Sequence, residues 1–332
     1  MIARESNEVG VVGLGLMGSS IVAALLMQGY KVIAVAPLSS DLELAPGRIL
    51  HALEQSFKQG IHKHDVKQLE SNVLYTEDYG DLHNCFFISE CVSENIDIKK
   101  TVYASIESSV SDNAIITTNT SAIPITILQE TVNRPERFLG MHWAEPAFTT
   151  PFLEITCGAK TDVDVAEELY AIASKWGKEP TLLRKDIRGF ITNRLMYAMF
   201  REGFNLVENG YASIEDIDRA CRNDAGHWMT FCGMFRFMDL TGLQAYYHVI
   251  KDLFPTLSNQ TETPKLIEAI AKEGGNGVAN GRGFYKYSKE EAAAWEKAFE
   301  EFSYDINSLA SKYPIDLVEK RLGKKQREDE SR

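Results

Sequence analysis

The chain has 332 residues, of which 44% are hydrophobic and 25% charged, and its formal net charge is −12. This length allows two ordinary domains, each with its own core. The acidic balance argues against a nucleic-acid or anionic-membrane partner, because binding to phosphates depends on lysine and arginine. No apolar stretch approaches the roughly 18 residues of a membrane helix, and the N-terminal sequence does not resemble a secretory signal. A cytoplasmic protein is expected.

The five cysteines include no C-x-x-C pair and are odd in number, which is typical of reduced thiols. His62 and His64 form an H-x-H in a segment typical of a turn between helices. Since no acid or cysteine stands at ligand spacing, no metal site is predicted.

Short apolar or β-branched runs alternate with helical patterns through the first part of the chain. They cover residues 8–12, 31–36, 73–76, 85–89, 114–118, 138–142, 152–156 and 180–184. Strands that alternate with helices predict a mainly parallel, doubly wound α/β sheet of the Rossmann type. We place this dinucleotide-binding domain at residues 1–188.

From residue 190 onward the patterns are helical, which predicts an all-helical C-terminal domain at 189–332. Ser213 with Asp216, and Ser288 with Glu291, have the spacing of helix N-caps. The last helix carries an apolar stripe that either joins two subunits or covers the domain's own core. The members of the stripe are Trp295, Phe299, Phe302, Ile306 and Leu309. The charged tail 324–332 is expected to be disordered.

The segment VGVVGLGLMGSS contains a G-x-G-x-x-G pattern between a strand and a helix, formed by Gly13, Gly15 and Gly18. The first glycine permits a tight turn, the second allows a pyrophosphate to approach the backbone, and the third allows the helix to pack closely on the strand. Leu16 and Met17 lie inside the turn and belong to the expected cofactor contacts. At the start of a βαβ unit, this pattern predicts dinucleotide binding.

Ala36 stands where such a unit usually presents an acid to the adenosine ribose. Loss of the acid removes a preference for NAD but does not create one for NADP, which also requires a nearby cation. Asp41, Glu43 or the serines at 39 and 40 could take over the contact. We expect NAD with a modified adenosine grip, and NADP remains open.

Four further stretches indicate the chemistry: TTNTSAI (117–123), GMHWAEPAFTTPFLEI (140–155), RGFITNRLMYAMFREGFNLVENGYASIEDID (188–218) and GRGFYKY (281–287). With the glycine turn, and in this order, they resemble the 3-hydroxyacyl-CoA dehydrogenase family over residues 8–287. The resemblance implies NAD-dependent oxidation of a secondary 3-hydroxyl on a small-molecule substrate, and a homodimer.

His142 is the candidate base, because neutral histidine accepts a proton near pH 7 and the strand before it ends at the carboxyl edge of the sheet. Glu154 could accept the other ring N–H and fix the tautomer. Ser121 and Asn193 match the family's remaining catalytic positions, where a hydroxyl and an amide hydrogen-bond the substrate oxygen. Alternatively, each caps a helix.

Glu94 and Lys99 match the family's contacts on the nicotinamide side, although an exposed charge pair would also explain them. Three departures from the family pattern concern the cofactor. Ala36 lacks the acid, Glu145 replaces an asparagine before proline, and Ala279–Asn280 replaces a lysine-containing loop. Ser121 is also counted among the cofactor contacts.

The leading expectation for the substrate is a 3-hydroxyacyl-CoA, whose phosphates could meet Lys58, Lys63 and Lys67. One alternative is a free hydroxy acid, as for the family's gulonate and carnitine dehydrogenases, with Arg194 or Arg236 on the carboxylate. Another is a non-catalytic scaffold that binds the cofactor, as in lambda-crystallin. A pure scaffold has no physical need of the Ser121, His142, Glu154 and Asn193 set.

Overall fold

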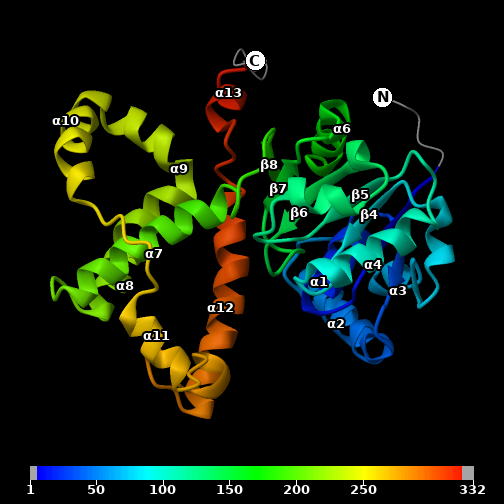
Figure 1. Cartoon of the computed structure of the whole chain (residues 1–332), viewed down its shortest axis with the longest axis horizontal. Helices are drawn as coiled ribbons and strands as arrows, with labels where there is room; N and C mark the ends of the chain where they lie inside the picture. The colour runs from blue at the N-terminus through cyan, green and yellow to red at the C-terminus, as the bar shows by residue number, and fades with distance from the viewer. Residues whose placement is uncertain (1–5, 324–332) are drawn as a thin grey trace. The chain divides into compact units, whose positions relative to one another are not determined.

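The computed structural model describes residues 6–323, and the tail expected to be disordered, 324–332, lies outside them. Eight strands form one sheet in the order β3-β2-β1-β4-β5-β6-β7-β8 (Figure 1). Their bounds are β1 Glu8–Val12, β2 Lys31–Val35, β3 Val73–Thr76, β4 Phe87–Glu90, β5 Ile115–Thr118, β6 Phe138–Trp143, β7 Phe152–Cys157 and β8 Glu179–Leu183. Only β6 and β7 pair antiparallel. The predicted, mainly parallel sheet is confirmed.

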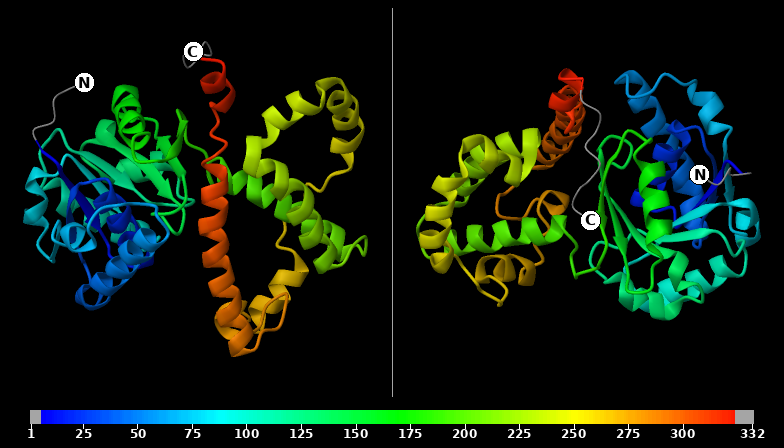
Figure 2. Two further views of the ribbon diagram at one scale, coloured as in Figure 1. Left: turned by 180° about the vertical axis from the view of Figure 1, so that it is seen from behind. Right: turned by 90° about the horizontal axis from the view of Figure 1, so that it is seen from above.

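Helices cover both faces of this sheet, as Figure 2 shows. One face packs against α1 (Leu16–Met27), α2 (Ser39–Lys58), α3 (Val66–Glu70) and α6 (Val163–Ala173). The other packs against η1 (Tyr79–Asn84), α4 (Ile96–Glu107) and α5 (Ile125–Leu128). Since side chains alternate along a strand, Val11 enters the first core and Val12 the second. The continuous apolar runs of the sequence are therefore buried on both sides.

The carboxyl ends of β1, β4, β5 and β6 lie at one edge of the sheet, because these strands are parallel. The strand order changes direction between β1 and β4, and this switch point is where doubly wound sheets bind their ligands. The glycine turn follows β1 there, Ser121 follows β5, and His142 lies near the end of β6.

Gly18 is required by the packing of α1 on this edge. A Cβ added at Gly18 would lie 1.8 Å from the carbonyl oxygen of Gly13, so the helix could not keep its place. A Cβ at Gly15 would have no heavy atom within 4 Å. Gly18 is therefore required by the fold, whereas Gly15 leaves the turn open to an approaching ligand.

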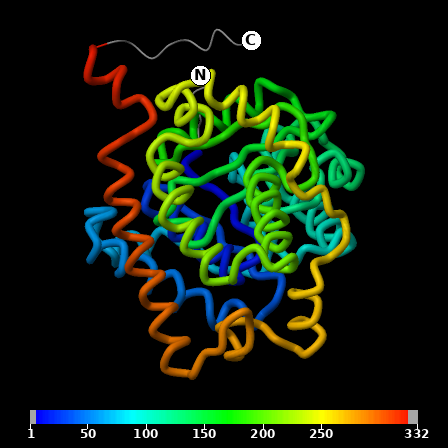
Figure 3. Tube along the Cα trace, turned by 90° about the vertical axis from the view of Figure 1, so that its left-hand side faces the viewer, coloured from blue at the N-terminus to red at the C-terminus, as the bar shows by residue number. Residues whose placement is uncertain are grey.

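The chain divides into two compact units, Met1–Arg194 and Leu195–Arg332. The second is helical, as predicted, and Figure 3 shows its longest helix, α12, in orange. Its helices, the first of which begins just before the division, are α7 Thr192–Glu208, α8 Ile214–Ala220, α9 Gly226–Thr241, α10 Leu243–Leu253, α11 Lys265–Lys272, α12 Lys289–Ala310 and α13 Leu317–Arg321. Short η4 (Cys221–Ala225), η5 (Phe254–Thr256) and η6 (Val278–Asn280) join them. Both predicted N-caps are present, at Ser213 and Ser288.

The helical unit has almost no buried side chains of its own. Among the described residues from Leu195 onward, Tyr304 alone is buried. In the apolar stripe of α12, Trp295 is 64%, Phe299 66% and Phe302 59% exposed, so the stripe does not cover a core within this chain. No helix in residues 6–323 is both long and apolar enough to cross a lipid bilayer.

The different roles of the two glycines can be tested by substitution. Gly18→Ala is expected to lower the free energy of unfolding by roughly 1–3 kcal/mol, the usual range for an overpacked site. Gly15→Ala is the matched control and should leave stability unchanged or slightly raised, because its φ of −62° suits alanine. Urea unfolding of both variants measures the difference. Equal stability of the two would show that α1 shifts without loss.

Candidate active site

The strand pairing between β6 and β7 places His142 directly opposite Glu154. Both side chains lie on the face away from Met141 and Ile155, and the His142 Nδ1 is 3.0 Å from the Glu154 Oε2. The histidine side chain is 12% exposed and the glutamate 1%. The strand pairing therefore brings together two residues that are twelve positions apart, in an environment almost free of water. A contact between the Glu154 carboxylate and the His142 ring was predicted.

The second oxygen of Glu154 is bound by the start of α7. Its Oε1 accepts hydrogen bonds from the backbone N–H groups of Ile191 (2.9 Å) and Thr192 (3.0 Å). Burial raises the pKa of the Glu154 carboxyl, but the hydrogen bonds from His142 and from the two N–H groups outweigh it and hold the pKa below its ordinary value. With a charged carboxylate at Nδ1, that nitrogen carries the proton and Nε2 is the acceptor.

Ser121 and Asn193 meet at the same edge. The Asn193 Nδ2 donates to the Ser121 carbonyl oxygen at 2.7 Å. Neither side chain caps a helix: the N-cap of α5 is Pro124, which makes no side-chain capping bond, and α7 begins one residue before Asn193. The capping alternatives are therefore not seen, whereas the catalytic roles of Ser121 and Asn193 stay predictions.

Glu94 and Lys99 lie in a buried network rather than in an exposed pair. The Lys99 Nζ contacts the Glu90 Oε1 at 2.9 Å and the Glu94 Oε2 at 3.5 Å, and its side chain is 1% exposed. Glu94 also accepts hydrogen bonds from the Thr120 hydroxyl and from the Ser121 N–H. Glu94, which is 42% exposed, is therefore the accessible member of the network, and Lys99 stands behind it.

Glu90 is a member of this network that the sequence analysis missed. It is fully buried at the end of β4, and besides Lys99 it accepts hydrogen bonds from Tyr103 (2.8 Å), Thr118 (2.7 Å) and the Val92 N–H (2.6 Å). The available signal was an acid that ends an apolar parallel strand at the carboxyl edge, which is where ligand sites form.

The glycine turn has the geometry of a dinucleotide cradle. Gly13 adopts a φ of +94°, and its N–H donates to the Val35 carbonyl. Gly15 precedes α1 without a side-chain cap, so the first N–H groups of the helix are available to a phosphate. Together with the open space at the Gly15 Cα, these features fit the pyrophosphate of NAD. Ala36, after β2, is buried, and its N–H donates to the Thr76 carbonyl.

The segment between β6 and β7 is held against α1 and the start of β8. Ser20 of α1 accepts a hydrogen bond from the Ala147 N–H at 2.7 Å. Burial raises the pKa of Glu145, and a hydrogen bond with Ser20 partly opposes this. Lys178 donates to the Ala147 and Thr150 carbonyls, and burial lowers its pKa to about 8. Glu145 is thus fixed close to the helix that follows the glycine turn.

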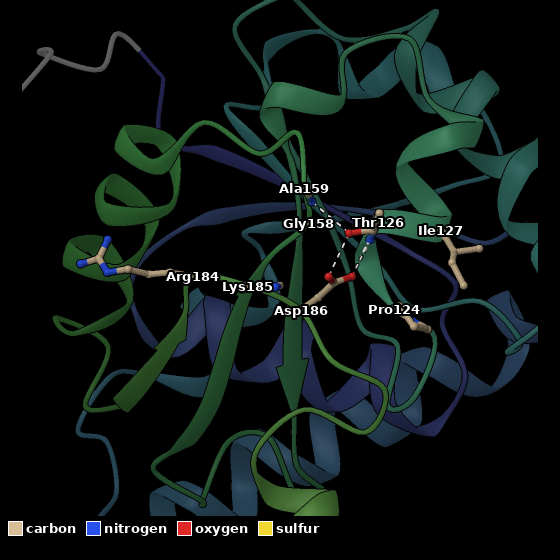
Figure 4. A pocket seen from close by; sticks show the side chains of 8 residues that line it. All are labelled: Pro124, Thr126, Ile127, Gly158, Ala159, Arg184, Lys185 and Asp186. Atoms are coloured by element: carbon tan, nitrogen blue, oxygen red, sulfur yellow. Dashed lines mark hydrogen bonds between the residues drawn. The ribbon is translucent and has the colours of Figure 1, made fainter.

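A separate hollow of about 650 Å³ lies where β7 and β8 end, at the opposite edge of the sheet (Figure 4). Asp186 accepts hydrogen bonds there from the Thr126 N–H (2.7 Å) and hydroxyl (2.9 Å). None of the predicted site residues lines this hollow. In residues 6–323, no cluster of three or more His, Cys, Asp or Glu side chains is arranged to hold a metal ion.

The sequence profile of the NAD-binding domain of 3-hydroxyacyl-CoA dehydrogenase matches residues 8–187, and that of its C-terminal domain matches residues 189–287. The chain belongs to the 3-hydroxyacyl-CoA dehydrogenase family. It is an NAD-dependent oxidoreductase of this type, and the resemblance drawn from its motifs is confirmed.

Two kinds of relatives are similar to the chain. A Mesorhizobium japonicum protein named 5-formyl-3-hydroxy-2-methylpyridine 4-carboxylate 5-dehydrogenase is 30% identical over 87% of this chain and 93% of the relative. A crystal structure of a dehydrogenase of the same name, described as an NAD+ dependent dismutase, matches with a TM-score of 0.87 at 28% identity, over 93% of this chain and 100% of the other. The (S)-3-hydroxybutyryl-CoA dehydrogenase of Ralstonia eutropha matches with a TM-score of 0.71 at 27% identity, over 86% and 100%.

Removal of the imidazole tests the base. His142→Gln is expected to lower turnover by roughly 10²- to 10⁴-fold, the usual share of general acid–base catalysis, and to leave NADH binding unchanged. Steady-state kinetics and a fluorescence titration with NADH measure the two effects. His83→Gln is the control, since His83 is exposed and its ring bonds to the Gly80 carbonyl of its own turn. Unchanged turnover in His142→Gln would remove this residue from the mechanism.

Proposed function

We propose that the chain interconverts a hydroxyl and a carbonyl group, with His142 as the base. The carrying observation is the 3.0 Å contact between its Nδ1 and the buried Glu154, which leaves Nε2 available to take the hydroxyl proton. The charged carboxylate stabilises the imidazolium that forms and keeps the ring oriented. NAD, when bound, supplies the hydride acceptor.

The remaining predicted residues take roles consistent with their places. We assign the Ser121 hydroxyl and the Asn193 amide to the substrate oxygen, where they would stabilise developing charge. For the cofactor, the turn Gly13–Gly18 holds the pyrophosphate, and Glu94 and Glu145 face the nicotinamide half. Lys99 acts through Glu94, because its own side chain is buried.

For the substrate we propose a small free acid that carries the reacting hydroxyl or aldehyde, ahead of a CoA thioester. The support is the higher TM-score and wider coverage of the pyridine-carboxylate dehydrogenase compared with the hydroxybutyryl-CoA enzyme. Arg194 follows Asn193 directly and is exposed, so it is our candidate for the substrate carboxylate.

A CoA thioester is the second candidate for the substrate. It was the leading expectation from the sequence motifs. It is favoured by the match to both domains of the 3-hydroxyacyl-CoA dehydrogenase family. Three exposed lysines could meet its phosphates: Lys58 at the end of α2, Lys63 in the segment that follows, and Lys67 in α3.

We also propose that the working form is a homodimer. Aromatic and aliphatic side chains are exposed along most helices of the second unit, and with a single buried residue between 195 and 323 this unit lacks a core of its own. A second copy would bury these side chains.

The substrate class can be decided by one assay. NADH oxidation is measured with acetoacetyl-CoA, with 5-formyl-3-hydroxy-2-methylpyridine 4-carboxylate and with the oxo forms of small hydroxy acids such as gulonate and carnitine. We expect kcat/KM to favour a free acid by roughly tenfold or more, because an ion pair with Arg194 is available only to a substrate that carries a carboxylate. Arg194→Gln should then raise KM for that acid but not for acetoacetyl-CoA, and Lys63→Gln serves as the reverse control. No turnover with any compound, despite NADH binding, would favour the non-catalytic scaffold.

The adenosine grip is tested at Ala36. Ala36→Asp should tighten NADH and weaken NADPH, because a carboxylate accepts hydrogen bonds from the ribose hydroxyls and repels a 2′-phosphate. Fluorescence titration of wild type and variant with both cofactors gives the ratio. Ala36→Asn is the uncharged control and should leave the ratio near that of wild type. If the ratio of the NADH and NADPH affinities is the same in Ala36→Asp as in wild type, the ribose is held elsewhere.

A further inference from the structure

Glu154 divides its two oxygens between two partners. Oε2 faces the His142 ring, and Oε1 accepts from the backbone N–H groups of Ile191 and Thr192 and, at 3.3 Å, from the Thr192 hydroxyl. The side chain is 1% exposed, so these donors take the place of water. The orientation of the carboxylate is therefore set as much by the chain at 191–192 as by the histidine.

The N–H groups of Ile191 and Thr192 have no partner inside a helix. Helix α7 begins at Thr192, and the first N–H groups of any helix point away from its carbonyls. A carboxylate at this end is also favoured by the helix dipole. Glu154 is thus the acceptor for the start of α7, although it lies 37 residues before Ile191 on another element.

A left-handed turn brings these donors to the site. Gly189 has a φ of +79°, and Phe190, with a φ of +50°, is the only non-glycine residue in 6–323 with a positive φ. Phe190 is 1% exposed, and its ring lies 6.0 Å from the His142 ring, centroid to centroid. The same turn therefore packs against the base and aims the N–H groups at its partner.

We propose that Ile191 and Thr192 are positioning residues for the base, acting through their backbone N–H groups on Glu154. They keep the carboxylate charged and turned toward Nδ1, and so keep Nε2 free to accept the substrate proton. This inference rests on the proposed role of His142.

The test is Thr192→Pro, which removes one N–H and the hydroxyl at a position where proline is well accepted, the first residue of a helix. The His142–Glu154 pair then lacks one hydrogen bond that favours its unprotonated form. The pair is therefore protonated more easily. We expect kcat to fall roughly tenfold, and the acid limb of the kcat/KM profile to move to higher pH by about half a unit to one unit. NADH affinity should be unchanged.

Thr192→Val is the matched control, since it keeps the N–H and removes only the longer hydroxyl contact; kcat is expected within about twofold of wild type. A Thr192→Pro enzyme that binds NADH but shows the wild-type pH profile would overturn the inference. Failure of the proposed function would be distinguishable, because the wild-type acid limb would then persist in His142→Gln.

Hydrogen exchange provides a second measurement that does not depend on how the proline variant folds. The Ile191 and Thr192 amides belong to exposed residues at a helix start, where exchange is ordinarily fast. We expect both to exchange about tenfold or more slowly in the wild type than in Glu154→Ala. Equal rates in the two proteins would show that Glu154 does not hold them.

Discussion

The antiparallel pairing of β6 with β7 is the constraint on which the site depends. The six other strand pairings could be satisfied by any doubly wound sheet, but the reversal at the segment 144–151 brings Glu154 against His142 in register. A slip of one strand by one residue would leave His142 and Glu154 on opposite faces of the sheet. The register of two strands thus decides whether His142, the proposed base, meets Glu154.

Two buried carboxylates, Glu90 and Glu154, are stabilised in the same way. Each is almost inaccessible to solvent, and each has both oxygens occupied by donors. An unpaired charge buried so deeply would destabilise the folded chain by several kcal/mol. A carboxylate whose oxygens all accept hydrogen bonds instead holds its donor groups in place. Glu90 therefore fixes Lys99 on the proposed cofactor side, and Glu154 fixes His142 on the proposed substrate side.

Contacts connect the two sides without interruption. Glu90 holds Lys99, Lys99 contacts Glu94, Glu94 accepts from the Ser121 N–H, and the Ser121 carbonyl accepts from Asn193. Asn193 in turn follows the residues that hold Glu154. The left-handed Phe190 completes this arrangement at a cost of about 1–2 kcal/mol of backbone strain, which its complete burial offsets.

Local sequence patterns were sufficient for the strands, the glycine turn and the two helix N-caps. Periodicity and capping each act over a few residues, so these features follow from the amino-acid sequence by itself. The contact of His142 with Glu154 was expected only with the family resemblance added to the pattern of the two strands. Glu90, the N–H groups of Ile191 and Thr192, and the left-handed Phe190 were not predictable in this way. Nearly every residue has a backbone N–H, so the sequence does not mark which of these groups will act as donors. A buried acid is distinguished from an exposed one only by the neighbours that fold around it. Those neighbours come from β4, β5, α4 and α7, and the tertiary structure alone brings them together.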